Sequence, residues 1–97
     1  MKPSASLEMH IDQVRGILDR AGMRNPRLFG STARGEDRED SDLDILVEVP
    51  PGTSLFDLAD VEIALEKLLG CKVEVLTKGF LAPDVAERAE TDMVPIL

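Results

Sequence analysis

The chain has 97 residues, 43% of them hydrophobic and 31% charged, and its formal net charge is −8. This length suits one domain over residues 1–97 with one modest core, and the hydrophobic share excludes a disordered chain. The negative charge and the lack of tryptophan and tyrosine argue against direct nucleic-acid binding, which relies on basic and base-stacking side chains. No stretch resembles a signal peptide or a membrane span, so we expect a cytoplasmic protein without membrane contact.

The first predicted element is a helix over residues 6–21. Apolar side chains recur there at the spacing that places them on one helical face. Ser4 or Ser6 suits the start of this helix because a serine hydroxyl accepts hydrogen bonds from free backbone N–H groups. Gly22 suits its end, where glycine readily adopts a left-handed conformation.

A short strand and a tight turn are predicted next. Asn25-Pro26 is typical of a turn, and residues 27–29 are expected to form the strand. Gly30-Ser31 interrupts this strand. We expect one helical turn over residues 32–35 and a solvated polar loop over residues 36–41.

The second half of the chain predicts a strand, a helix and another strand. Residues 43–49 are nearly continuous in apolar side chains, which is typical of a strand covered on both faces, and Pro50-Pro51-Gly52 ends it. A helix is expected between a cap at Ser54 and a stop at Gly70. Residues 71–76, CKVEVL, predict the third strand.

The chain end predicts a last helix over residues 83–91, with a proline in its first turn, and then an extended apolar tail, MVPIL. The phenylalanines are expected in the core. The order of these elements indicates an α/β (α+β) fold, with one small mixed sheet flanked by helices.

Two aspartates at the start of the second strand are the first candidates for chemistry. Side chains alternate along a strand, so Asp42 and Asp44 point to the same face. Two such charges repel by about 2–3 kcal/mol at an effective dielectric near 20, and a divalent cation removes this cost. Oxygen ligands favour magnesium, or manganese. The alternative is an Asp-x-Asp pair that caps a turn or faces water.

A third carboxylate lies in the next predicted strand. Glu74 points to the face opposite its valine neighbours, and it joins Asp42 and Asp44 if the two strands pair. Three carboxylates on one face could hold two metal ions, which clamp both ends of a phosphoryl displacement. A glutamate on a solvated strand face is the alternative reading.

The Gly30-Ser31 turn is a candidate anion site. Glycine lets the backbone approach a ligand closely, and free amides at the start of a helical turn attract phosphate. Ser31 adds a hydroxyl, and Arg34 follows one turn later. The alternative is a loop glycine followed by a serine cap.

The combination is more specific than its parts. Gly30-Ser31 is followed after ten residues by Asp42-x-Asp44 and later by an acidic residue within a strand. The string GSTARGEDREDSDLDILVEV closely resembles the signature of the minimal nucleotidyltransferases, in the superfamily of DNA polymerase beta. These small proteins are often paired as antitoxins with HEPN-domain toxins, and the resemblance covers essentially the whole chain.

The resemblance implies a role for each matched position. Asp42 and Asp44 would bind Mg²⁺, with Glu74 as a further metal ligand or as the base near the acceptor hydroxyl. Gly30-Ser31 would hold the phosphates of ATP, assisted by Arg34. The superfamily more often has aspartate at the position of Glu74, which puts the geometry there in doubt.

The resemblance leaves three functions open. The first is metal-dependent transfer of AMP from ATP to a HEPN-type toxin in a hetero-oligomer; the chain has no tyrosine, so a tyrosine acceptor would come from another molecule. The second is a binding module that neutralises a toxin by contact alone. The third is a transferase that acts on a small molecule such as an antibiotic, and the absence of an acceptor-binding domain counts against it.

Overall fold

The computed structural model contains three helices and four strands in its described part, residues 1–77 and 93–96. The elements are α1 (Pro3–Met9), α2 (Ile11–Arg20), β1 (Arg24–Phe29), β2 (Leu43–Glu48), α3 (Leu55–Leu69), β3 (Val73–Leu76) and β4 (Val94–Pro95). The helix expected over residues 83–91 lies outside the described residues. Within the described part, no helix combines the length and apolar character needed to cross a membrane.

The strands form one sheet in the order β3-β2-β1-β4. β2 pairs in parallel with β3, whereas β1 pairs antiparallel with both β2 and β4. A parallel pair needs a long crossover connection, and α3 supplies it. The prediction of a small mixed sheet with helices is therefore confirmed, and part of the apolar tail is extended as β4.

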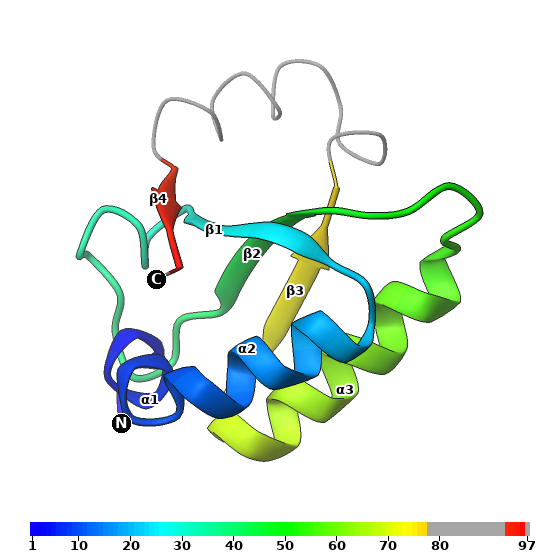
Figure 1. The fold of residues 1–97 in the computed structure, drawn as a ribbon. Coiled ribbons are helices and arrows are strands. Elements are labelled where there is room, and N and C mark those ends of the chain that lie inside the picture. The colour runs from blue at the N-terminus through cyan, green and yellow to red at the C-terminus, as the bar shows by residue number, and fades with distance from the viewer. Residues whose placement is uncertain (78–92, 97) are drawn as a thin grey trace.

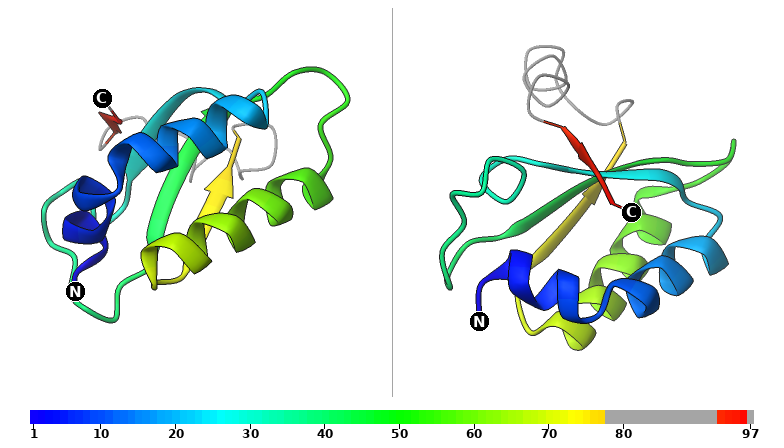
Figure 2. Two further views of the ribbon diagram at one scale, coloured as in Figure 1. Left: turned by 60° about the horizontal axis from the view of Figure 1, so that its bottom comes forward. Right: turned by 60° about the vertical axis from the view of Figure 1, so that its left-hand side comes forward.

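The helices lie on one face of this sheet. α2 and α3 run side by side across it, and α1 lies beside the ends at which β2 and β3 begin (Figures 1 and 2). The core between helices and sheet takes alternate residues of the strands. These are Leu43, Ile45 and Val47 of β2 and Val73 and Val75 of β3.

The prediction of one continuous first helix is wrong in detail. The structure breaks it at His10, whose backbone (φ −115°, ψ 23°) leaves the helical region between α1 and α2. α1 begins after Lys2 without a side-chain cap, so neither Ser4 nor Ser6 caps it in the expected way. Both serines lie inside α1, and their hydroxyl groups bond to distant parts of the chain.

The turn predicted at Asn25-Pro26 is instead part of β1. The register of β1 against β2 shifts between Arg24 and Arg27, and Asn25 has a φ of +49°. Such a shift marks a β-bulge, and asparagine tolerates positive φ better than most residues. The same residues that favour a turn therefore allow a distortion within a strand.

α3 follows its local signals closely. Ser54 and Asp57 form a reciprocal capping box at its start, and Gly70 ends it with a φ of +73°. The expectation that the phenylalanines lie in the core is wrong for Phe56, which is 83% exposed in the first turn of the helix. Phe80 lies outside the described residues. The residues that α3 does bury are Leu58, Val61, Leu65 and Leu69.

Candidate active site

Two neighbouring strands carry the predicted carboxylates. β2 and β3 pair in parallel with Asp44 opposite Glu74, as expected if the two strands are adjacent. Asp42 directly precedes β2 and has the same parity as Asp44. The residues that flank Asp44 and Glu74 face the core beneath the sheet, and these are Leu43, Ile45, Val73 and Val75. The carboxylates therefore leave the sheet on the face away from the helices.

The strand that carries Glu74 is held on both sides. Among the described strands β3 lies at the edge of the sheet, so its outward N–H groups have no partner in these strands. Two glutamates of α3 accept these groups: Val75 N–H donates to Glu62 Oε2 at 2.8 Å and Val73 N–H donates to Glu66 Oε2 at 3.1 Å. Sequence reasoning missed both glutamates, because their spacing within α3 indicates only a helical face.

Asp44 and Glu74 bring negative charges close together. Burial raises the pKa of Asp44 to about 6, together with the charges of Glu74 and Asp42 and a hydrogen bond with Glu74. The charge of Lys72 opposes this rise. A bound proton or a cation would relieve the repulsion, since both reduce the negative charge between the strands.

A metal ion fits this site by the chemistry of its donors. Carboxylate oxygens are hard ligands, and Mg²⁺ commonly combines one or two carboxylates with phosphates of a substrate. Within residues 1–77 and 93–96, however, no group of three or more His, Cys, Asp or Glu side chains is placed to hold a metal ion by itself. The metal-binding roles of Asp42, Asp44 and Glu74 therefore stay predictions.

Gly30 lies directly against Asp44. It follows Phe29, which is opposite Asp44 across β1 and β2, and its φ is +74°. A Cβ atom at residue 30 would lie 2.7 Å from Asp44 Oδ2. Glycine is therefore needed for two reasons, the backbone conformation and the space that the Asp44 carboxylate occupies. This packing brings the start of the Gly30-Ser31 turn to the Asp44 carboxylate.

The segment expected to form one helical turn is a run of hydrogen-bonded turns, in which Arg34 N–H donates to Gly30 O at 3.3 Å with the spacing of one α-helical turn. Glu36 N–H donates to Ser31 O at 2.9 Å, and Gly35 N–H donates to Thr32 O at 3.2 Å. Arg34 is exposed, and its Nε donates to Glu36 Oε2 at 3.2 Å. Phosphate binding by Gly30, Ser31 and Arg34 stays a prediction.

The family follows from a comparison with known proteins. Residues 11–96 match the model of a family described as the nucleotidyltransferase domain. The chain belongs to the nucleotidyltransferase family. A Methanocaldococcus jannaschii protein provisionally named a protein adenylyltransferase is 39% identical over 92% of this chain and 100% of its own length. The protein adenylyltransferase MntA of Thermococcus cleftensis is 40% identical over 80% of this chain and 79% of its own.

Solved structures agree with this assignment. A minimal nucleotidyltransferase aligns with a TM-score of 0.82 and 40% identity over 95% of this chain and 94% of its own. A toxin–antitoxin complex with AMP-PNP aligns with a TM-score of 0.78 at 17% identity, over 89% of this chain and 71% of its own. A complex of a tri-AMPylated Shewanella oneidensis HEPN toxin with its MNT antitoxin aligns with a TM-score of 0.72 at 14% identity, over 93% of this chain and 71% of its own. The two complexes show a shared fold.

The nucleotidyltransferase has polar groups near the site that the sequence did not single out. Asp37 is only 5% exposed, which corrects the expectation that the whole acidic loop is solvated. Thr32 is 6% exposed, and its hydroxyl has no hydrogen-bond partner among the described residues. No local signal in the sequence distinguishes Asp37 from its acidic neighbours, because Asp37 is bound by Ser4, which is distant in sequence.

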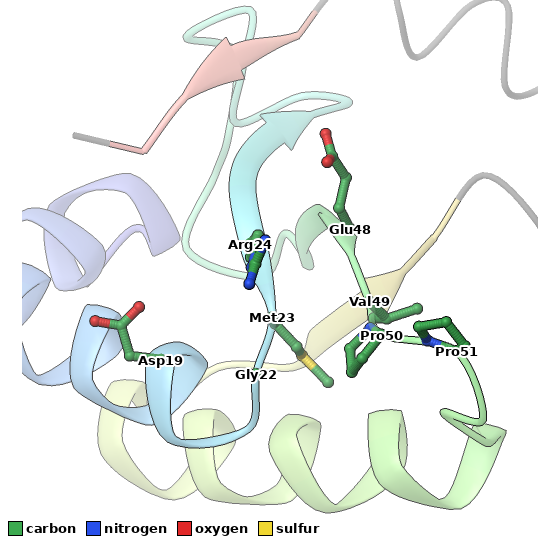
Figure 3. Close-up of a pocket in the computed structure, with 8 residues that line it drawn as sticks. All are labelled: Asp19, Gly22, Met23, Arg24, Glu48, Val49, Pro50 and Pro51. Atoms are coloured by element: carbon green, nitrogen blue, oxygen red, sulfur yellow. The ribbon is translucent and has the colours of Figure 1, made fainter.

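The nucleotidyltransferase also has a pocket of about 530 Å³ at the end of β2 that is opposite to Asp42 and Asp44 (Figure 3). Its lining includes Met23, Arg24, Glu48 and Pro50. Because Asp42 and Asp44 lie at the beginning of β2 and Glu48 at its end, this pocket is separate from the carboxylate pair.

Replacing Gly30 by alanine is expected to destabilise the nucleotidyltransferase by about 2–3 kcal/mol. About 1–2 kcal/mol comes from the left-handed backbone, and the remainder from displacement of the Asp44 carboxylate. Gly35→Ala is the matched control, because Gly35 has a φ of +72° and no neighbour within 4 Å of an added Cβ. Urea unfolding of both variants measures the difference, and equal losses would contradict the contact with Asp44.

Proposed function

We propose that this nucleotidyltransferase transfers AMP from ATP to a hydroxyl group of a partner protein in a Mg²⁺-dependent reaction. The observation that carries the proposal is the Asp44–Glu74 pair on adjacent parallel strands, with Gly30 packed against Asp44. The relatives named as protein adenylyltransferases support both the nucleotide and the class of acceptor.

The proposal assigns a role to each residue of the site. Asp42 and Asp44 would hold Mg²⁺ together with the phosphates of ATP, and the ion would neutralise phosphate charge. The Gly30-Ser31 turn would bind the outer phosphates through its amides and hydroxyl, with Arg34 as a further donor. Catalysis would then consist mainly of positioning and charge neutralisation.

The transfer balances as a displacement at phosphorus. The acceptor oxygen forms a bond to the α-phosphorus, and the bond from this phosphorus to the bridging oxygen of the β-phosphate breaks. Pyrophosphate leaves, and the acceptor becomes a phosphodiester with AMP. We assign the hydroxyl proton to Glu74, which neighbours Asp44 across the strands.

The partner that we propose is a HEPN-type toxin. Proteins of this fold occur in toxin–antitoxin complexes, one of which contains a tri-AMPylated HEPN toxin. This chain has no tyrosine, so transfer to a tyrosine would require a second protein. The chain would therefore act as an antitoxin within a hetero-oligomer.

A binding module without chemistry is the second candidate. It is favoured by the lack, in the described residues, of a three-ligand group arranged for a metal, and by glutamate at position 74. Such a module would neutralise its toxin by contact, and its net charge of −8 suits a basic partner.

The experiment that separates the two candidates uses ATP labelled on either the α- or the γ-phosphate. The chain is incubated with a co-expressed HEPN-type toxin and Mg²⁺, with an EDTA-treated reaction as control. Adenylyl transfer is expected to label the toxin from α-labelled ATP alone, and EDTA should abolish the label. A neutralised toxin without any label would identify the binding module instead.

A further inference from the structure

One acid of the loop that leads into the site is turned inward. Asp37 is 5% exposed, whereas its neighbours Glu36, Arg38, Glu39 and Asp40 are all exposed. Its two carboxylate oxygens accept separate hydrogen bonds from one residue of α1. Ser4 N–H donates to Oδ2 at 2.9 Å and the Ser4 hydroxyl donates to Oδ1 at 3.1 Å.

The hydrogen bond from Ser4 N–H to Asp37 gives an acceptor to a backbone group that has none within α1. The first N–H groups of a helix have no acceptor within the helix, and Pro3, in the first turn, has no N–H at all. Lys2, at the cap position, makes no side-chain capping hydrogen bond. Asp37 therefore supplies the acceptor from a distant part of the chain.

Asp37 makes these bonds as a carboxylate. Burial alone would raise its pKa, but the backbone and hydroxyl bonds from Ser4, its own backbone N–H and the charge of Lys2 together lower the pKa below its usual value. A charged acceptor strengthens both bonds to Ser4. The loop that precedes Asp42 is thus firmly tied to α1.

A second hydrogen bond joins α1 to the segment that leads into β3, the strand that carries Glu74. The Ser6 hydroxyl donates to Leu69 O at 2.7 Å in a buried bond. Leu69 is the last residue of α3, from which the chain continues directly into β3 and Glu74. The beginnings of the two strands are also joined, since Leu43 N–H donates to Lys72 O at 2.8 Å.

We propose that α1 braces the active site and that Asp37 is a positioning residue, which acts on Asp42 and Asp44 through its bonds to Ser4. One short helix holds both segments that lead into the carboxylate strands, and so sets the position of Asp42 and Asp44 relative to Glu74. This inference rests on the proposed nucleotide site. It assigns to α1 a role in ligand binding beyond its contribution to stability.

The test compares Asp37→Asn with Asp40→Asn, which removes the same charge from an exposed position in the same loop. In the ATP-free protein, we expect faster hydrogen exchange at the amides of Asp42 and Leu43 in Asp37→Asn only. We also expect its Kd for ATP with Mg²⁺, measured by calorimetry well below the melting temperature, to rise about tenfold, which corresponds to 1.4 kcal/mol. Asp40→Asn should stay within about twofold of wild type.

A double-mutant cycle separates the brace from general stability. Ser4→Ala keeps the backbone donor but removes the hydroxyl, so it should weaken ATP binding by about threefold, and its effect should not add to that of Asp37→Asn. This milder variant also serves if Asp37→Asn does not fold. A purely structural role would lower the melting temperature and leave the Kd unchanged.

The outcomes distinguish this inference from the proposed function. Unchanged exchange at Asp42 and Leu43 with an unchanged Kd would overturn the brace, as would equal effects of Asp37→Asn and Asp40→Asn. If wild-type protein binds no ATP with Mg²⁺, the proposed function fails. The exchange measurement then still decides whether Asp37 orders the beginning of β2.

Discussion

Replacing both Asp42 and Asp44 by asparagine is expected to abolish nucleotidyl transfer while the fold stays intact. The change keeps the size of both side chains but removes the charges proposed to hold Mg²⁺ against the phosphates. Loss of a single electrostatic stabiliser commonly costs 10²–10³-fold in rate, so we expect a loss of at least about 10³-fold for the pair. The measurement is transfer of label from α-labelled ATP, with circular dichroism as the check on folding.

The control for this variant is Asp40→Asn with Asp60→Asn. Both residues are exposed acids, so this variant has the same net charge as the site variant and keeps the site. It should transfer label at the wild-type rate. Undiminished transfer by the Asp42→Asn, Asp44→Asn variant would exclude these carboxylates from catalysis and from essential metal binding.

The single change Asp44→Asn is expected to stabilise the metal-free protein above pH 6. The pKa of Asp44 is about 6 in the folded state against 3.8 for an ordinary aspartate. Because the folded state holds the proton more tightly, the stability from this group is fully present below pH 3.8 and is lost as the pH rises through 6. The full shift corresponds to about 3 kcal/mol, and partial solvation of the half-buried site reduces this to about 1–2 kcal/mol.

This gain should be visible as a rise in melting temperature. For a domain of this size, 1–2 kcal/mol corresponds to a shift of roughly 5–10 °C. The measurement is thermal unfolding with EDTA between pH 4 and pH 8, with Asp40→Asn as the control that should not shift. In wild type, ATP with Mg²⁺ should raise the melting temperature by mass action, and Asp44→Asn should lose most of this response.

A flat stability of wild type between pH 4 and pH 7 would contradict the repulsion at the Asp44–Glu74 pair. The same conclusion would follow if Asp44→Asn were no more stable than wild type at pH 8. If the prediction holds, the carboxylate pair lowers the stability of the apo fold, as expected where a protein keeps a group for its function.

The local signals of the sequence were accurate where one segment carries all the information. Ser54 with Asp57 and then Gly70 set both ends of α3, because each acts on backbone groups within a few residues. The alternation around Asp44 and Glu74 predicted which side chains leave the core, since the pleat of a strand has a period of two. The motif from Gly30 to Asp44 identified the family.

The errors arose where a local preference has two outcomes. Asn25-Pro26 favours a turn, and in β1 the same residues form a bulge because pairing with β2 continues on both sides. An apolar pattern continues through His10, but the backbone breaks there between α1 and α2. In each case, contacts with other elements decide between two conformations of similar local energy.

By itself, the sequence determined the family, the mixed α/β composition, the two caps of α3 and the face on which Asp44 and Glu74 lie. Only the tertiary structure decided that these two residues are directly opposite each other, that Gly30 makes room for Asp44, and that Asp37 is buried against Ser4. The reason is physical, because periodicity and capping depend on neighbours within a few residues. Ser4 and Asp37 are 33 residues apart, and they meet only when helix and sheet pack around a common core.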